Sequence, residues 1–131
     1  MRILCTIRQS LKTGLAATLD EQELEDAIET IKDPEPYLMD EAPGGLTFEW
    51  KLKSAEVSVE GGTLAATRVL LFTFVVTDRS AYDEWCKSNG LDHEDNLFLS
   101  HLLGDYQGSF VGDEMVDFDN QVSTEVELPG Q

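Results

Sequence analysis

Residues 46–77 read LTFEWKLKSAEVSVEGGTLAATRVLLFTFVVT, and this stretch decides the fold. Its first half alternates apolar and polar residues, which is the period of a β-strand with one buried face. From Ala55 onward the apolar positions shift by one residue, as a β-bulge would produce. Gly61 and Gly62 then form a favoured two-residue hairpin loop. The return run, from about 64 to 77, is largely apolar, so we expect a central strand that is covered on both faces.

The sequence around this hairpin predicts further elements, bounded by helix caps, prolines and glycines. In chain order they are a strand over 1–9, a helix capped by Thr18 or Asp20 that ends at Lys32, a loop over 33–45, a helix over 81–88 capped by Ser80, a helix over about 93–103 capped by Asp92, a loop over 104–112, a short strand over 113–119 and an edge strand over about 122–128.

This order of elements predicts one α+β domain that spans residues 1–131. We expect a largely antiparallel sheet built around the long hairpin, with the helices on one side. A ferredoxin-like variant fits, because its core order is βαββαβ. Hydrophobic residues make up 41% of the chain, which is enough for a core.

Charge is the unusual feature of the composition. The formal net charge is −17, and the pI is near 4.1. Residues 20–41 carry −9 and residues 80–131 carry −11, whereas residues 1–19 carry +3 and residues 42–79 are neutral. Segregated charge indicates an interaction surface. Two plainer interpretations stay open, which are ordinary solubility and adaptation to high salt; the second predicts acids on every exposed face.

Several classes are disfavoured by the same composition. The negative field repels phosphate, which argues against direct binding to nucleic acid or to an anionic membrane. No apolar run approaches the length of a membrane span, and the N-terminus has no continuous apolar stretch typical of a signal peptide, so we expect a cytoplasmic protein. Cys5 and Cys86 are expected to be buried thiols in a reducing compartment, although a single bridge between them stays open.

No catalytic or metal constellation is visible in the sequence. The two histidines, His93 and His101, would lie about 12 Å apart along a helix, too far for one metal ion. An EF-hand pattern that starts at Asp117 fails, because Gln121 and Val122 occupy its fifth and sixth positions. Neither Gly-Gly pair has the spacing of a phosphate loop. We therefore expect no enzyme, no cofactor and no metal site.

The two acidic segments lead to the main functional hypothesis. A duplex carries one phosphate charge per roughly 1.7 Å of axis, and two acidic segments on one face would approach that density. The hypothesis is a nucleic-acid mimic, an inhibitor that occupies the basic groove of a nucleic-acid-binding protein. Tyr37, Trp85 and Tyr106 are candidate anchors, although Trp85 fits a core position equally well. The predicted partner-binding residues are Asp20, Glu21, Glu25, Asp26, Glu29, Asp83, Glu84, Asp92, Glu94 and Asp95.

In size and charge the chain is similar to the broad class of small acidic inhibitors that phages encode against host defence nucleases, although it matches no motif of one such family. Other hypotheses stay open. The protein could be an immunity protein or antitoxin for one toxin enzyme, or a structural subunit of a phage or cellular complex that uses the 46–77 hairpin. A small enzyme is the least supported. The sequence leaves the oligomeric state open.

Overall fold

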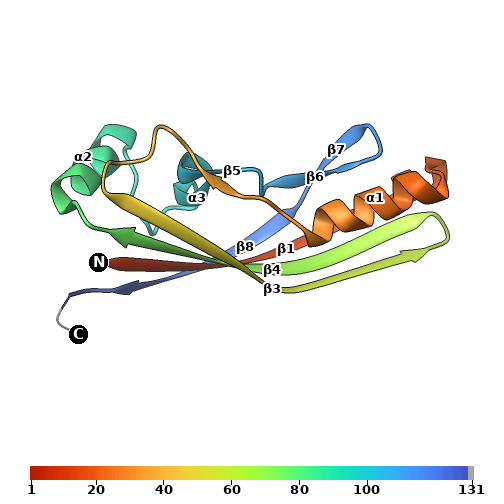
Figure 1. Ribbon diagram of the computed structural model, residues 1–131, viewed down its shortest axis with the longest axis horizontal. Coiled ribbons are helices and arrows are strands. Elements are labelled where there is room, and N and C mark those ends of the chain that lie inside the picture. The colour runs from red at the N-terminus through yellow and green to blue at the C-terminus, as the bar shows by residue number, and fades with distance from the viewer. Residues whose placement is uncertain (130–131) are drawn as a thin grey trace.

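A four-stranded antiparallel sheet forms the base of the computed structural model, which describes residues 1–129. The order of its strands is β3-β4-β1-β8. Their bounds are Arg2–Thr13 for β1, Leu46–Glu60 for β3, Thr63–Val76 for β4 and Asp119–Glu127 for β8. All other elements lie on one side of this sheet (Figure 1). The predicted α+β class, with helices on one side of an antiparallel sheet, is confirmed.

The connections follow the order of a ferredoxin-like fold. β1 and β3 both run antiparallel to β4, which lies between them, so the unit from β1 to β3 is a split βαβ. It contains the 3₁₀ helix η1 (Gly14–Thr18) and α1 (Glu21–Lys32). The second crossover, which connects β4 to β8, contains α2 (Arg79–Asn89) and α3 (Phe98–Leu102). β8 then pairs with the free edge of β1.

Two small ribbons complete the layer above the sheet. β2 (Tyr37–Leu38) pairs with β5 (Leu103–Gly104), and β6 (Gly108–Val111) pairs with β7 (Glu114–Asp117). Both ribbons are antiparallel. The β6–β7 ribbon lies beside α1 at the same end of the molecule (Figure 1). The expected loop over 104–112 is therefore wrong in part, because its three glycines, Gly104, Gly108 and Gly112, lie in β5, in β6 and in the turn between β6 and β7.

The long hairpin has the two local features that its sequence predicts. The register of β3 against β4 shifts between Leu52 and Ser54, which is the expected bulge. Gly61 and Gly62 both have left-handed backbone angles, with φ of 58° and 82°. A Cβ atom at Gly62 would lie 2.7 Å from the Cβ of Ala17, so this position also needs the small residue for space.

β4 is central, but only one of its faces is covered. Leu70, Phe72 and Phe74 on the inner face are fully buried, whereas Val69 and Leu71 on the outer face are only half-buried. The expectation of two covered faces is wrong. The reason is that both helical crossovers pass over the same side of the sheet, and an antiparallel sheet tolerates one solvated face.

Helix starts differ from the sequence predictions in the second crossover. α2 begins at Arg79 because Asp78, not Ser80, accepts a hydrogen bond from the backbone N–H of Ala81 at 3.0 Å. Asp92 does not cap a long helix. Its Oδ1 accepts from the N–H of Glu94 at 2.8 Å and closes a turn, and α3 starts only at Phe98.

Both cysteines are free thiols, so there is no bridge between them. Cys5 is fully buried on the inner face of β1, and Cys86 is half-buried on α2. Burial raises the pKa of the Cys5 thiol to about 11, since a thiolate would lose its hydration there. Burial also raises the pKa of Cys86.

Candidate functional site

The net charge of the chain lies entirely in the layer that covers the sheet. We call residues 14–45 and 77–118 the acidic layer. It contains 20 acids and three bases, a formal charge of −17 that equals the net charge of the whole chain. The four sheet strands contain six acids and six bases and are neutral. The structure thus separates a charged side from a neutral one.

All 26 carboxylates are exposed at the surface. Within residues 1–129, ion pairs join only Arg2 to Glu127 at 2.8 Å and Arg79 to Asp83 at 3.0 Å. Both pairs are largely exposed and therefore contribute little to stability. Most carboxylates of the acidic layer consequently keep their oxygens available to the cations of a partner.

α1 carries the densest part of this charge. Asp20 and Glu23 form a capping box, in which Asp20 Oδ1 accepts from the N–H of Glu23 at 2.8 Å and Glu23 Oε1 accepts from the N–H of Asp20 at 3.2 Å. Ala27 and Ile31 bury the opposite side of the helix. The segment from Asp20 to Asp33 holds seven acids and one base in about 20 Å, or one net charge per about 3.3 Å.

The ten predicted partner-binding residues are all exposed and belong to the acidic layer. They form two groups. Asp20, Glu21, Glu25, Asp26 and Glu29 belong to α1 and its cap, and Asp83, Glu84, Asp92, Glu94 and Asp95 belong to α2 and the turns after it. The two groups share one side of the sheet but lie toward opposite ends of its long axis (Figure 1).

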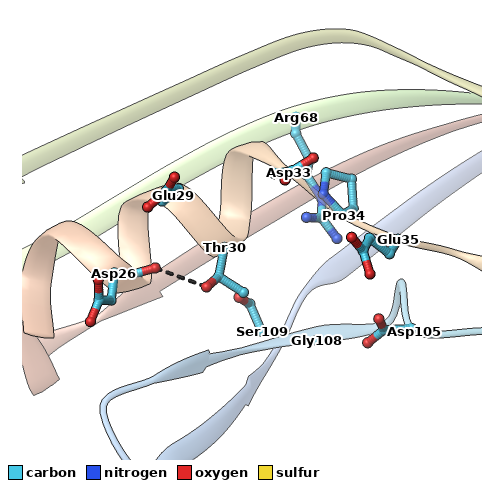
Figure 2. Close-up of a pocket in the computed structure, with 10 residues that line it drawn as sticks. All are labelled: Asp26, Glu29, Thr30, Asp33, Pro34, Glu35, Arg68, Asp105, Gly108 and Ser109. Atoms are coloured by element: carbon cyan, nitrogen blue, oxygen red, sulfur yellow. Dashed lines mark hydrogen bonds between the residues drawn. The ribbon is translucent and has the colours of Figure 1, made fainter.

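A cavity of about 400 Å³ lies between the C-terminal half of α1 and β6. Figure 2 shows carboxylates around it and a guanidinium between its two walls. Five acids line this pocket, together with Arg68 from β4 and Ser109 from β6. The acids are Asp26, Glu29, Asp33, Glu35 and Asp105. Sequence reasoning placed two of the five, Asp26 and Glu29, in the binding surface and missed the others.

Arg68 is buried, with 2% of its surface exposed, and it joins both walls of the pocket. Its Nη1 donates to the carbonyl of Ile31 in the last turn of α1 at 2.8 Å, and its Nη2 donates to the carbonyl of Tyr106 before β6 at 3.0 Å. The guanidinium also lies 4.1 Å from the ring centroid of Phe118. Burial lowers the pKa of Arg68 to about 10, while nearby Asp105 raises it, so the group stays charged at neutral pH.

Ser109 is the second polar residue of the pocket that the sequence did not indicate. Only 4% of its surface is exposed, and its Oγ has no hydrogen-bond partner among the described residues. Figure 2 shows its side chain extending from β6 toward Thr30 on the facing helix. Asp105, which leads into β6, has a left-handed backbone with φ of 64°, a conformation that non-glycine residues adopt rarely.

Two of the three predicted anchors belong to the core. Trp85 is buried at 9% exposure and donates through Nε1 to the carbonyl of Glu41 at 3.0 Å, and Tyr106 is buried at 3%. Tyr37 is 55% exposed. Sequence reasoning missed Phe110 and Met115, which are cross-strand partners on the β6–β7 ribbon and are 55% and 53% exposed.

Each of the two histidines contacts an aromatic side chain of α2. The ring Nδ1 of His93 lies 2.9 Å from the hydroxyl of Tyr82, and the ring of His101 lies edge-on to Trp85. Burial raises the pKa of Tyr82, so its hydroxyl stays protonated. Among residues 1–129, no three side chains of His, Cys, Asp or Glu converge as they would to hold a metal ion.

Two further findings bear on function. Within the described part of the chain, no helix has the length and apolar character needed to cross a membrane. Comparison of the chain with protein-family models and with curated proteins found no match.

Proposed function

We propose that the protein is an acidic inhibitor that occupies the basic groove of a nucleic-acid-binding protein, as a nucleic-acid mimic in the cytoplasm. One observation carries this proposal: the layer on one side of the sheet holds the entire net charge of −17, and the sheet itself is neutral. Acidity that served only solubility or high salt has no need for such a division. The protein would act by occupancy and without catalysis.

The charge density of α1 supports the same proposal. Its one net charge per about 3.3 Å is close to the roughly 3.4 Å between phosphates along one strand of a duplex. Lys and Arg side chains that pair with phosphates would pair with exposed carboxylates such as Glu21 and Glu25. Because these charges have no ion-pair partner among residues 1–129, they would also accelerate encounter with a basic partner.

Exposed apolar side chains beside the acidic helix supply contacts that do not depend on salt. Phe110 and Met115 project from the ribbon next to α1, and Tyr37 is exposed at the β2–β5 ribbon. Aromatic and methionine side chains at the centre of an interface often carry much of the binding energy. A basic groove that contains an apolar pocket is therefore the expected partner surface.

The proposal is tested in two steps. Proteins retained by the tagged protein from lysate at about 50 mM and about 500 mM salt are first identified by mass spectrometry. Each retained partner is then purified and mixed with its labelled nucleic acid, and displacement is followed by fluorescence anisotropy. A mimic displaces the nucleic acid, and its affinity falls steeply with salt. A partner that binds this protein and nucleic acid simultaneously would overturn the proposal.

Matched charge reversals locate the contact. Glu21→Lys with Glu25→Lys on α1 should weaken displacement at least tenfold at about 150 mM salt. Glu56→Lys with Glu60→Lys on β3 changes the net charge equally but lies outside the acidic layer, and it should weaken displacement much less. Equal losses from the two variants would show that total charge, and not the acidic layer, governs binding.

A further inference from the structure

We propose that the pocket between α1 and β6 receives a basic peptide segment of the partner. Arg or Lys side chains of the segment would pair with the carboxylates of the pocket. A backbone carbonyl of the segment would accept hydrogen bonds from Arg68 and Ser109, the two buried polar residues that form the floor of the pocket. This inference rests on the proposed function, because it assigns a specific contact to the acidic layer.

The charges of the pocket select a cationic ligand. Its five carboxylates are exposed, and Arg68 is the one cation among the residues that line it. The formal sum is −4. An anion would meet this field before it reached the buried guanidinium, so Arg68 does not make the pocket an anion site. A cationic side chain is attracted by both walls, since Asp26 and Asp33 come from the helical side and Asp105 comes from the connection before β6.

The floor of the pocket has hydrogen-bond donors that the described residues leave unused. Ser109 Oγ is buried and has no hydrogen-bond partner within residues 1–129, although native proteins satisfy most buried polar groups. Arg68 has five N–H groups and uses three in its hydrogen bonds to Gln9, Ile31 and Tyr106. A backbone carbonyl of a bound segment would accept from such donors. The side chain next to that carbonyl would then reach the carboxylates above.

The size of the pocket favours a segment over a metal ion. About 400 Å³ is many times the roughly 30 Å³ that one water molecule occupies in the liquid. The carboxylates are spread over two walls, and among residues 1–129 no three ligating side chains converge. An extended organic cation can span that separation, whereas a single ion needs its ligands within about 2.6 Å.

The pocket is preformed, which reduces the entropy cost of binding. Arg68 fixes the distance between the end of α1 and the connection that leads into β6, because it donates to the carbonyls of Ile31 and Tyr106. The capping box holds the other end of α1, and pairing with β7 holds β6. The two walls are therefore in place without a partner.

The test uses the full protein and a hexa-arginine peptide, with hexaglutamate as the negative probe, in calorimetry and amide-shift titration at about 150 mM salt. Asp33→Asn with Glu35→Gln should weaken hexa-arginine binding at least fivefold. Asp83→Asn with Glu84→Gln removes the same charge from α2 and should weaken binding less than twofold. The amide shifts should centre on Ser109 and Thr30. Equal losses from both pairs, or shifts spread evenly over the acidic layer, would overturn the inference.

Ser109→Ala provides an independent readout. Loss of one hydrogen bond should weaken the binding of hexa-arginine about 2- to 10-fold. The midpoint of unfolding should stay unchanged or rise, because the variant removes a buried hydroxyl that no other described residue satisfies. Unchanged peptide affinity would overturn the role of the floor.

Failure of this inference differs from failure of the proposed function. If the Asp33 and Glu35 variant still displaces nucleic acid from the partner as well as wild type, the pocket contact is wrong and the mimic stands. If hexa-arginine binds in the pocket but no partner loses its nucleic acid, the mimic is wrong and the pocket stands.

Discussion

Arg68 on β4 and Gln9 on β1 are direct cross-strand partners, and Arg68 Nε donates to Gln9 Oε1 at 2.7 Å. Both side chains are buried on the inner face of the sheet. Gln9 Nε2 in turn donates to the carbonyl of Tyr106 at 2.7 Å and to Asn120 Oδ1 at 2.9 Å. This network ties both central strands, β8, α1 and the β5–β6 connection to one point in the core.

Arg68→Met should therefore destabilise the protein by about 3–5 kcal/mol, because it leaves buried acceptors without their charged donor. Arg8→Met removes the same charge from an exposed position on the outer face and should change stability by about 0.5 kcal/mol or less. Urea unfolding of the two variants measures the difference. Equal midpoints would show that the network contributes no net stability.

The two faces of β4 should respond differently to truncation. Phe72→Ala removes a fully buried ring that packs against Phe48 and Tyr106 and should cost about 3–5 kcal/mol. Leu71→Ala, the next residue, lies on the open face and should cost clearly less. Denaturant unfolding checks both, and a loss at Leu71 as large as that at Phe72 would indicate that a second layer covers the outer face in solution.

Asp20 has two roles that substitution can separate. Asp20→Ala removes both the helix cap and one charge, and it should destabilise the protein by about 1 kcal/mol. Asp20→Asn keeps a good cap and removes only the charge, so stability should be nearly unchanged. Thermal unfolding followed by circular dichroism distinguishes them. If both variants lose the same stability, the charge and not the capping bond supports α1.

The free energy of unfolding should fall as the pH rises above 9, because the Cys5 thiol ionises more readily in the unfolded chain than in the folded one. The folded pKa is about 11, against 9.0 for an exposed thiol. Between these values the unfolded chain releases the proton while the folded chain keeps it, so the folded state loses up to about 2 kcal/mol by pH 11. Cys5→Ala removes this contribution. Comparison of unfolding free energies from pH 8 to pH 11 should show a shallower decline for the variant, and parallel curves would contradict the assignment.

Local signals in the sequence predicted the hairpin well, and long-range packing explains what they missed. The phase shift at Ala55 and the pair Gly61-Gly62 act within a few residues, so the bulge and the turn are confirmed. Which side of the sheet the crossovers cover depends on the whole chain, and so the open face of β4 did not follow from its apolar run.

The same reasoning applies to the site. All predicted acidic residues are exposed because charge alone keeps carboxylates in water. Trp85 looked like an anchor because its helix is polar, but its ring packs edge-on against Phe98 in the core. Arg68 carried a readable signal, since it interrupts the inward-facing apolar positions between Ala66 and Leu70. Its hydrogen-bond partners come from three distant segments that no local pattern connects.

The neutral sheet beneath the acidic layer gives the molecule an uneven charge distribution, with the negative charge on the side of the helices. If the protein has a basic partner as proposed, the field of that partner would exert a torque as well as an attraction, and it would turn the helical side toward the partner before the surfaces touch. Molecules of equal charge spread evenly over all faces would be drawn in at random orientations. Charge on a single side would thus couple the encounter with such a partner to the alignment of the two surfaces.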